Sequence, residues 1–333
     1  MLTSGSQLRP IASTVLRFMG TLLAPGGNDA RLSILMYHRV LPQPDPMLPD
    51  DMDARAFERQ MTALSSHFHV LPLHEAVTRL QKASLPARAA CITFDDGYAD
   101  NAEVALPILQ RLGLHATFFI ATGYLDGGRM WNDSIIETVR RAPGPRLDLS
   151  GLTLGDHPIE TMTQRREAAM SLISALKYLS PEQRRREAEK LSRYLSVETP
   201  DQLMMQTKQV RALHNAGMDI GGHTVNHPIL TRVDNATARA EIADGRDSLE
   251  SIVGGRVSLF AYPNGRPRLD YNADHVNIVK QLGFSAAVST ASGAARASGD
   301  PYQLPRFAPW DEAPARFVMR LLKNYRESAA AQV

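Results

Sequence analysis

Short apolar runs of strand length alternate along this chain with longer segments whose apolar residues recur at helical spacing. The predicted strands cover residues 32–37, 70–71, 89–94, 116–121, 218–221, 257–261 and 284–288. Predicted helices lie near residues 53–68, 74–81, 101–113, 238–252 and 273–282, the first of them capped by Asp53. Apolar strands that alternate with helices are typical of a parallel sheet covered by helices. The sequence therefore predicts an α/β fold whose sheet is either open or closed into a barrel.

Residues 126–209 depart from this alternation, because they contain no predicted strand and are mostly helical. Ser180, Pro181 and Gln183 form a capping box that starts a helix. This helix carries Arg184, Arg185, Arg186 and Lys190, interleaved with Glu182, Glu187 and Glu189. The mixed charge favours a solvent-exposed face over a surface that binds an anionic polymer. We interpret the stretch as a helical insertion in a single domain of residues 31–325, preceded by a separate N-terminal segment of residues 1–30.

The charge and cysteine content of the chain exclude several classes of protein. Lysine and arginine number 37 against 35 aspartate and glutamate residues, and the net charge of +2 predicts no nucleic-acid partner. No run approaches the ~20 consecutive apolar residues that cross a bilayer. The single cysteine, Cys91, rules out an internal disulfide framework and lies in an apolar run that predicts a buried thiol.

The N-terminal segment is moderately apolar from residue 11 to residue 24, although Arg17 interrupts it. No clear cleavage site for a signal peptide follows. We interpret the segment as a helix or a weak targeting segment, and an amphipathic helix at a membrane surface is an alternative. We expect a cytoplasmic protein, with peripheral membrane association and a periplasmic location as the alternatives.

Two adjacent carboxylates, Asp95 and Asp96, follow the predicted strand at residues 89–94, and Gly97 turns the chain directly after them. Active sites of parallel α/β folds are built at this end of the strands. Adjacent residues at a strand end point in different directions, so one carboxylate can bind a metal while the other accepts a proton. A helix N-cap followed by a turn is the alternative interpretation.

Two histidines, His223 and His227, follow the predicted strand at residues 218–221. Their spacing of four predicts one face of a helical turn, where both imidazoles can bind one metal ion. Two histidines and one aspartate are the ligand set of a catalytic zinc site, whereas two surface histidines are the alternative. His38 ends the strand at residues 32–37 and is a candidate general acid if it faces the same cavity, because histidine titrates near neutral pH.

The combination of Thr-Phe-Asp-Asp-Gly at residues 93–97 with His-Thr-Val-Asn-His-Pro at residues 223–228 resembles the signature of the polysaccharide deacetylases. These proteins form carbohydrate esterase family 4 and carry the NodB-homology domain. The resemblance spans about residues 31–310, and the segments at 36–40 and 260–265 look most like the bacterial exopolysaccharide branch. It implies a distorted (β/α) barrel of the NodB-homology type.

The resemblance also implies a role for each matching residue. Asp95 would be the general base, and Asp96, His223 and His227 would hold a divalent metal, most simply zinc. A Leu-x-His motif supplies the general acid in much of the family, but none occurs after residue 230. In the exopolysaccharide branch a histidine similar to His38 has that role.

A second departure concerns the family's Arg-x-Pro-Tyr motif, which corresponds to residues 261–264 and has Ala261 in place of its arginine. Arg306 is the predicted replacement that pairs with the catalytic aspartate, and the backbone N–H of Asn264 is the predicted oxyanion donor. The predicted substrate-binding residues are Tyr98, Tyr262 and Trp310, with Trp131 and Asn132 as candidates for lining a sugar groove. For Trp310, packing in the core is an equal alternative to a wall of the acetyl pocket.

These observations favour a metal-dependent hydrolase that removes N-acetyl groups from N-acetylhexosamine units. Its expected partner is an acetylated glycan of a bacterial polysaccharide, or the lipid-linked sugar that serves as its precursor. An O-acetyl polysaccharide esterase and a non-catalytic glycan-binding protein of polysaccharide assembly are the alternatives. The intact Asp95, Asp96, His223 and His227 disfavour the last of these.

Overall fold

The computed structural model describes residues 21–327 and 332–333, so most of the predicted N-terminal segment lies outside the described residues. The helices are α2 (Ala54–His67), α3 (Leu73–Gln81), α4 (Leu106–Arg111), α5 (Trp131–Arg141), α6 (Met162–Leu176), α7 (Pro181–Tyr194), α8 (Thr207–Asn215), α9 (Asn235–Val253), α10 (Ala273–Gln281) and α11 (Pro314–Asn324). The strands are β1 (Arg31–Tyr37), β2 (Val40–Leu41), β3 (Met52–Asp53), β4 (His69–Val70), β5 (Ala89–Phe94), β6 (Thr117–Ile120), β7 (Arg146–Asp148), β8 (Asp156–Pro158), β9 (Asp219–Gly222), β10 (Leu259–Ala261), β11 (Ala286–Ser292), β12 (Ala295–Arg296) and β13 (Leu304–Arg306).

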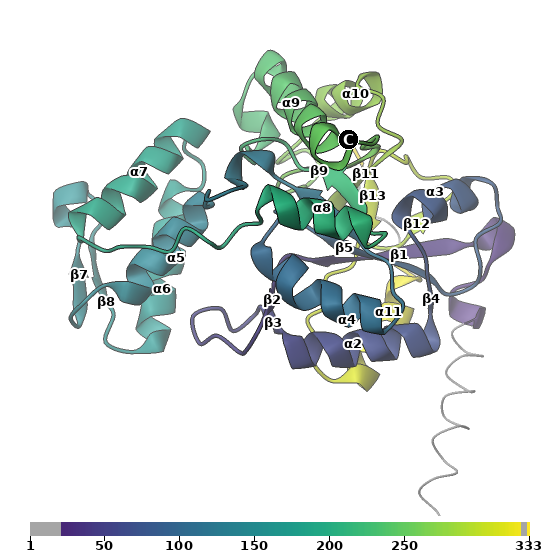
Figure 1. The fold of residues 1–333 in the computed structure, drawn as a ribbon, viewed down its shortest axis with the longest axis horizontal. Helices are drawn as coiled ribbons and strands as arrows, with labels where there is room; N and C mark the ends of the chain where they lie inside the picture. Colours follow the sequence, from purple (N-terminus) through teal and green to yellow (C-terminus); the bar gives the residue numbers. More distant parts are fainter. Residues whose placement is uncertain (1–20, 328–331) are drawn as a thin grey trace, which may run out of the picture.

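The main sheet follows the order β12-β1-β5-β6-β9-β10-β11-β13, with β4 also paired to β5. All of its pairs are parallel except β12 against β1. Just after β13, the Phe307 N–H donates to Ile34 O at 2.7 Å, and the Met36 N–H donates to Phe307 O at 2.9 Å. These bonds join the last strand to β1, so the sheet closes almost completely into the predicted barrel, with helices around it (Figure 1).

The apolar strands bury both of their faces, as the sequence predicts for a sheet covered by helices. Leu32 and Ile34 belong to one buried cluster, whereas Leu35 belongs to a second cluster with residues of the surrounding helices. Cys91 is a buried free thiol, as predicted. Asp53 accepts hydrogen bonds from two N–H groups at the start of α2, which confirms the predicted cap.

The helical insertion forms a lobe beside the barrel, built from α5, α6, α7 and the β7–β8 hairpin (Figure 1). It has its own buried apolar cluster, to which Met47 of the barrel also contributes. The capping box at Ser180 is confirmed. The prediction that this stretch holds no strand is wrong, because Leu147 of β7 pairs antiparallel with His157 of β8. Each strand has only three residues and Leu147 alone is buried, so no alternating pattern reveals the hairpin.

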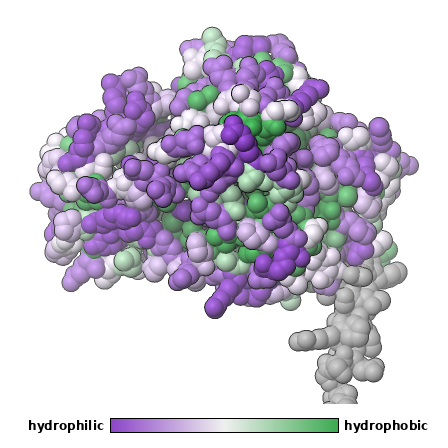
Figure 2. Space-filling view, viewed as in Figure 1, coloured by the Kyte–Doolittle hydropathy of each residue, from purple (hydrophilic) through white to green (hydrophobic). Residues whose placement is uncertain are grey.

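The surface in Figure 2 mixes hydrophilic side chains with small, scattered hydrophobic areas. In the part of the chain that the structure describes, no helix combines the length and apolar character needed to cross a bilayer.

Candidate active site

Asp95 and Asp96 follow the carboxyl end of β5, and the backbone conformation there points their two side chains in different directions. Asp96 and Gly97 have φ values of 76° and 91°, both in the left-handed region. A Cβ on Gly97 would approach Ile120 to 3.0 Å, so this turn requires glycine. Asp95 consequently faces Arg306, whereas Asp96 faces His223.

Asp96, His223 and His227 form a cluster whose potential ligand atoms all lie within 4.8 Å of one another. The Nε2 atoms of both histidines lie 3.4 Å from Oδ1 of Asp96. Nδ1 of His223 is 2.7 Å from the carbonyl oxygen of Ala261, a contact that orients the ring and leaves Nε2 toward the cluster. Two imidazole nitrogens and one carboxylate oxygen suit a divalent ion such as zinc.

The predicted helical turn for the two histidines is wrong. Residues 223–229 after β9 form no helix, and Thr224 and His227 have positive φ values of 68° and 51°. This irregular loop brings the two imidazole rings to a centroid distance of 4.7 Å. A loop rather than a helical turn therefore brings the two histidines together, because its residues with left-handed φ values fold the backbone back on itself.

Burial and neighbouring charges set the protonation of this cluster. Burial, together with the charges of His223 and Arg184, outweighs the effect of Asp96 and lowers the pKa of His227 to about 3. Burial raises the pKa of Asp96, but its hydrogen bond to His223 and the charge of His227 reverse this and hold the pKa below its usual range. Burial lowers the pKa of His223, but its hydrogen bond to Asp96 and the charges of Asp95 and Asp96 raise it overall. The neutral His227 and the ionised Asp96 are in the states that bind a metal.

Arg306 pairs with Asp95 through two parallel hydrogen bonds, of 2.7 Å to Oδ1 and 2.6 Å to Oδ2. Its Nε–H also donates to Ser289 O at 2.9 Å, and Nη1 donates to Thr93 Oγ1 at 3.2 Å. Burial raises the pKa of Asp95, but the Arg306 guanidinium overcomes this and lowers it. The predicted contact of Arg306 with Asp95 is therefore present, and it leaves a buried, ionised carboxylate.

A cavity of about 280 Å³ lies over these groups. It is lined by His38, Asp95, Asp96, Met130, Trp131, Asn132, Ile173, Lys177, Arg184, His223, His227, Asn264 and Thr290. The structure thus brings the predicted base, metal ligands and general acid to one cavity, together with Asn264 and the groove candidates Trp131 and Asn132. Asn264 has a φ of 58°, and within the described residues no group accepts its backbone N–H.

The insertion supplies cavity residues that the sequence did not predict, namely Ile173, Lys177 and Arg184. Arg184 was predicted on a solvent-exposed face, but it is only 3% exposed and stacks over Trp131 at 4.8 Å from the ring centroid. The rest of the charged face is solvent-exposed as predicted, since Arg185 and Arg186 pair with Glu189 and Glu182. The insertion is therefore part of the site.

The three predicted substrate-binding aromatic residues do not line this cavity. Tyr98 is buried and donates its hydroxyl hydrogen bond to Asp133 at 3.1 Å. Tyr262 is buried and stacks on Tyr271 at 4.0 Å. Trp310 is 74% exposed and lines a different cavity, so it does not pack in the core. Substrate binding by these three residues stays a prediction, and packing of the two tyrosines and the exposed position of Trp310 place their rings outside this cavity.

The buried carboxyl of Asp133, which accepts the hydrogen bond of Tyr98, is expected to make the stability of the fold depend on pH. Burial raises the pKa of Asp133 to about 7. A carboxyl whose folded pKa is raised favours folding at low pH and loses that contribution as pH rises through about 7. We expect the free energy of unfolding of Asp133→Asn, relative to that of the parent protein, to be higher at pH 8 than at pH 5. The change in this difference should be about 2–3 kcal/mol, measured by urea unfolding at each pH. Parallel pH profiles for the two proteins would contradict this assignment.

Comparison with known proteins extends these observations. A model described as polysaccharide deacetylase matches residues 82–287. The Bacillus subtilis protein YxkH, a polysaccharide deacetylase by name, is 23% identical over 281 residues, which cover 84% of this chain and 71% of YxkH. The Streptococcus pyogenes deacetylase PplD in complex with acetate matches with a TM-score of 0.59 and 21% identity, over 89% of this chain and 98% of PplD. IcaB from Ammonifex degensii matches with a TM-score of 0.57 and 19% identity, over 89% and 98% of the two chains. At these identities the two solved structures show a shared fold.

Proposed function

Because the chain belongs to the polysaccharide deacetylase family, we propose that it removes N-acetyl groups from N-acetylhexosamine units of a bacterial exopolysaccharide or of its lipid-linked precursor. The observation that carries the proposal is one cavity that holds both the ionised Asp95–Arg306 pair and the Asp96, His223 and His227 cluster. The solved PplD contains acetate, which is the acid product of such a reaction.

Asp96, His223 and His227 hold the divalent metal in this proposal, with zinc as the first choice. When bound, such an ion lowers the pKa of water and polarises the acetamide carbonyl. The fixed Nδ1 contact of His223 and the neutral state of His227 support this ligand set.

The chain's own residues complete the hydrolysis. Asp95 accepts the proton of the attacking water, because Arg306 keeps it ionised at neutral pH. The backbone N–H of Asn264 donates to the oxygen that gains negative charge. His38, exposed at the cavity, donates a proton to the nitrogen as the carbon–nitrogen bond breaks, so the products are acetate and a free amine.

Removal of the metal tests the proposal. We expect acetate release from N-acetylglucosamine oligomers to fall about 100-fold or more in chelator-stripped protein and to return when zinc is added, since the ion contributes several kcal/mol to catalysis. Acetate is measured with a coupled enzymatic assay, with buffer carrying zinc alone as the control. Full activity after verified metal removal would overturn the assignment of the cluster.

An O-acetyl polysaccharide esterase would use the same residues on a different bond. A matched pair of oligomers, one N-acetylated and one O-acetylated, separates the two functions. Faster acetate release from the N-acetylated oligomer supports our proposal, and release from the O-acetylated oligomer alone would replace it with the esterase.

A further inference from the structure

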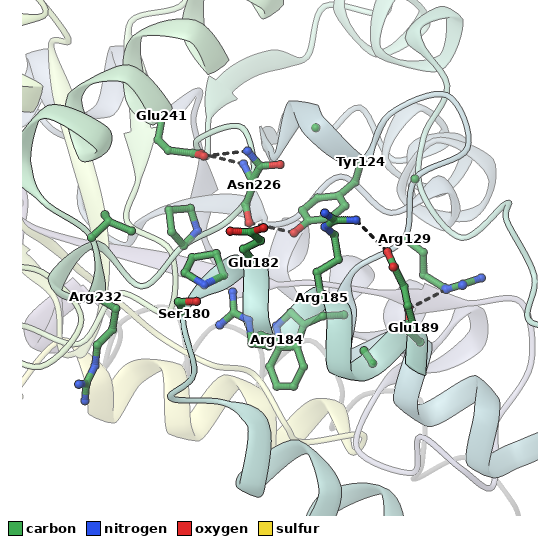
Figure 3. A pocket seen from close by; sticks show the side chains of 18 of the residues that line it. Tyr124, Arg129, Ser180, Glu182, Arg184, Arg185, Glu189, Asn226, Arg232 and Glu241 are labelled. Atoms are coloured by element: carbon green, nitrogen blue, oxygen red, sulfur yellow. Dashed lines mark hydrogen bonds and ion pairs between the residues drawn. The ribbon is translucent and has the colours of Figure 1, made fainter. Parts of the chain in front are cut away.

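A second and larger cavity, of about 840 Å³, lies between the insertion and the barrel (Figure 3). Trp131 and Arg184 line both this cavity and the one that holds Asp95 and Asp96. The two cavities therefore adjoin at these side chains. We refer to the larger one as the insertion cleft. Figure 3 shows Arg184 within it, between Ser180 on one side and Arg185 on the other.

Arg184 is a buried cation whose charge no carboxylate neutralises. Its Nε has no hydrogen-bond partner, and its Nη1 makes only a long bond of 3.4 Å to the carbonyl oxygen of Lys177. Among residues 21–327 and 332–333, no carboxylate forms an ion pair with it. A guanidinium cannot lose its proton in a protein, so it stays charged despite its burial. Burying an unpaired charge is costly, and an anionic ligand would offset that cost.

The carboxylates of the insertion cleft are engaged with other groups. Glu189 pairs with Arg185 at 3.0 Å, and Asp234 caps the start of α9 through Thr237. Glu241 accepts the backbone N–H groups of Val225 and Asn226 at 2.9 and 2.8 Å. Glu182 and Asp201, which also line the cleft, lie 3.8 Å from Arg186 and Arg129. None of these carboxylates forms an ion pair with Arg184, which leaves its charge available to a ligand.

Two further cations lie along the same path. Lys177 lines the smaller cavity beside Arg184, and Arg232 lines the insertion cleft. Neither forms an ion pair with a carboxylate among the described residues, and Arg232 stacks over Tyr178 at 5.4 Å. Lys177, Arg184 and Arg232 are therefore three cations of the adjoining cavities without a carboxylate partner among the described residues, although five carboxylates also line the insertion cleft.

We propose that Arg184 binds an anionic group, a carboxylate or a phosphate ester, on the part of the substrate that adjoins the acetylated sugar. This inference rests on the proposed function and names its substrate class: an acidic glycan or a glycosyl phosphate rather than a neutral homopolymer. The planar guanidinium matches either oxyanion with two parallel hydrogen bonds. Trp131 stacks beneath it and holds the guanidinium in place at the junction of the cavities.

Equilibrium binding to the metal-loaded full chain tests the inference without relying on turnover. One probe pair is a tetrasaccharide alternating glucuronic acid and N-acetylglucosamine, and its carboxyl methyl ester. The other pair is N-acetylglucosamine 1-phosphate and plain N-acetylglucosamine. We expect at least one anionic probe to bind about tenfold or more tightly than its neutral partner, as charge-assisted hydrogen bonds predict. The pair that shows the preference identifies the source of the anion.

Arg184→Gln should abolish that preference, and Arg184→Lys should retain part of it. Arg193→Gln is the matched control, because it makes the same change at an exposed arginine of α7 that lines neither cavity, and it should preserve the preference. Thermal unfolding of each variant verifies that it is folded. Equal binding of both members of each pair by the parent protein, or an unchanged preference in folded Arg184→Gln, would overturn the inference.

Acetate release from a neutral oligomer with no preference for anions would refute this inference alone, whereas anion binding with no acetate release from any substrate would refute the proposed function alone.

Discussion

Replacing Arg306 by leucine is expected to lower the free energy of unfolding by about 3–5 kcal/mol, as removal of one partner from a buried ion pair does. Asp95 is only 2% exposed, and Arg306 supplies both of the ionic hydrogen bonds to its carboxylate. Without them the carboxylate is a buried charge that must take up a proton or destabilise the fold. Chemical denaturation at neutral pH measures the loss.

Two comparisons distinguish the ion pair from a general effect of removing an arginine. Arg111 pairs with Glu58 at 2.8 Å in a solvent-exposed position, so Arg111→Leu should cost less than about 1 kcal/mol. The double variant Asp95→Leu, Arg306→Leu should be more stable than Arg306→Leu alone, because it leaves no buried charge. A double variant less stable than the single one would contradict this account.

In the proposed reaction Arg306 acts only through its contact with Asp95, as a positioning residue. Since Arg306 lowers the pKa of Asp95, its removal should raise that pKa. The acid limb of the kcat/KM profile should then move to higher pH, because the base must be ionised to accept a proton. Arg306→Lys should restore part of the original profile, whereas a purely structural role would leave the limb where it is.

Asp95→Asn is expected to reduce acetate release about 10²–10⁴-fold, the range that a general base contributes. The amide occupies the same space but accepts no proton from water. The contrast with Asp96→Asn separates the two carboxylates, because only Asp96 belongs to the metal cluster. Zinc content, measured by atomic absorption, should remain near that of the parent protein in Asp95→Asn and fall in Asp96→Asn. Full acetate release by Asp95→Asn, or loss of its zinc, would contradict the assigned roles.

The barrel could be predicted because its strands are buried on both faces and therefore read as continuous apolar runs. Residues 89–94 were predicted as a strand and form β5 with the same bounds. The strands β12 and β13 were not predicted, since each has only two or three residues and one holds Pro305. The helix predicted from residue 101 begins instead as a π-helix over Asn101–Ala105, which periodicity does not reveal.

The cluster of Asp96, His223 and His227 could be predicted because its residues carry a paired motif at two strand ends. Arg184 could have been identified by a different signal, its position four residues before Ala188 and seven before Leu191, both buried on the same helix face. Its glutamate neighbours concealed this, since they made the arginine run resemble a solvated surface. Tyr98 and Tyr262 are adjacent to motif residues, yet sequence proximity does not determine where a large ring packs.

The junction of β13 with β1 has a consequence for the order in which the protein matures. Asp95 and Arg306 are separated by 211 positions, and Arg306 reaches the carboxylate only when the last strand of the barrel is in place. Contacts of such large sequence separation form slowly, because a long loop must close first. During synthesis, β5 leaves the ribosome long before β13 does, so the nascent barrel holds Asp95 without the cation that lowers the pKa of its carboxyl. If Asp95 is the base, as we propose, catalytic competence arrives with the final strand, and recovery of activity after refolding reports closure of the barrel rather than formation of its earlier helices and strands.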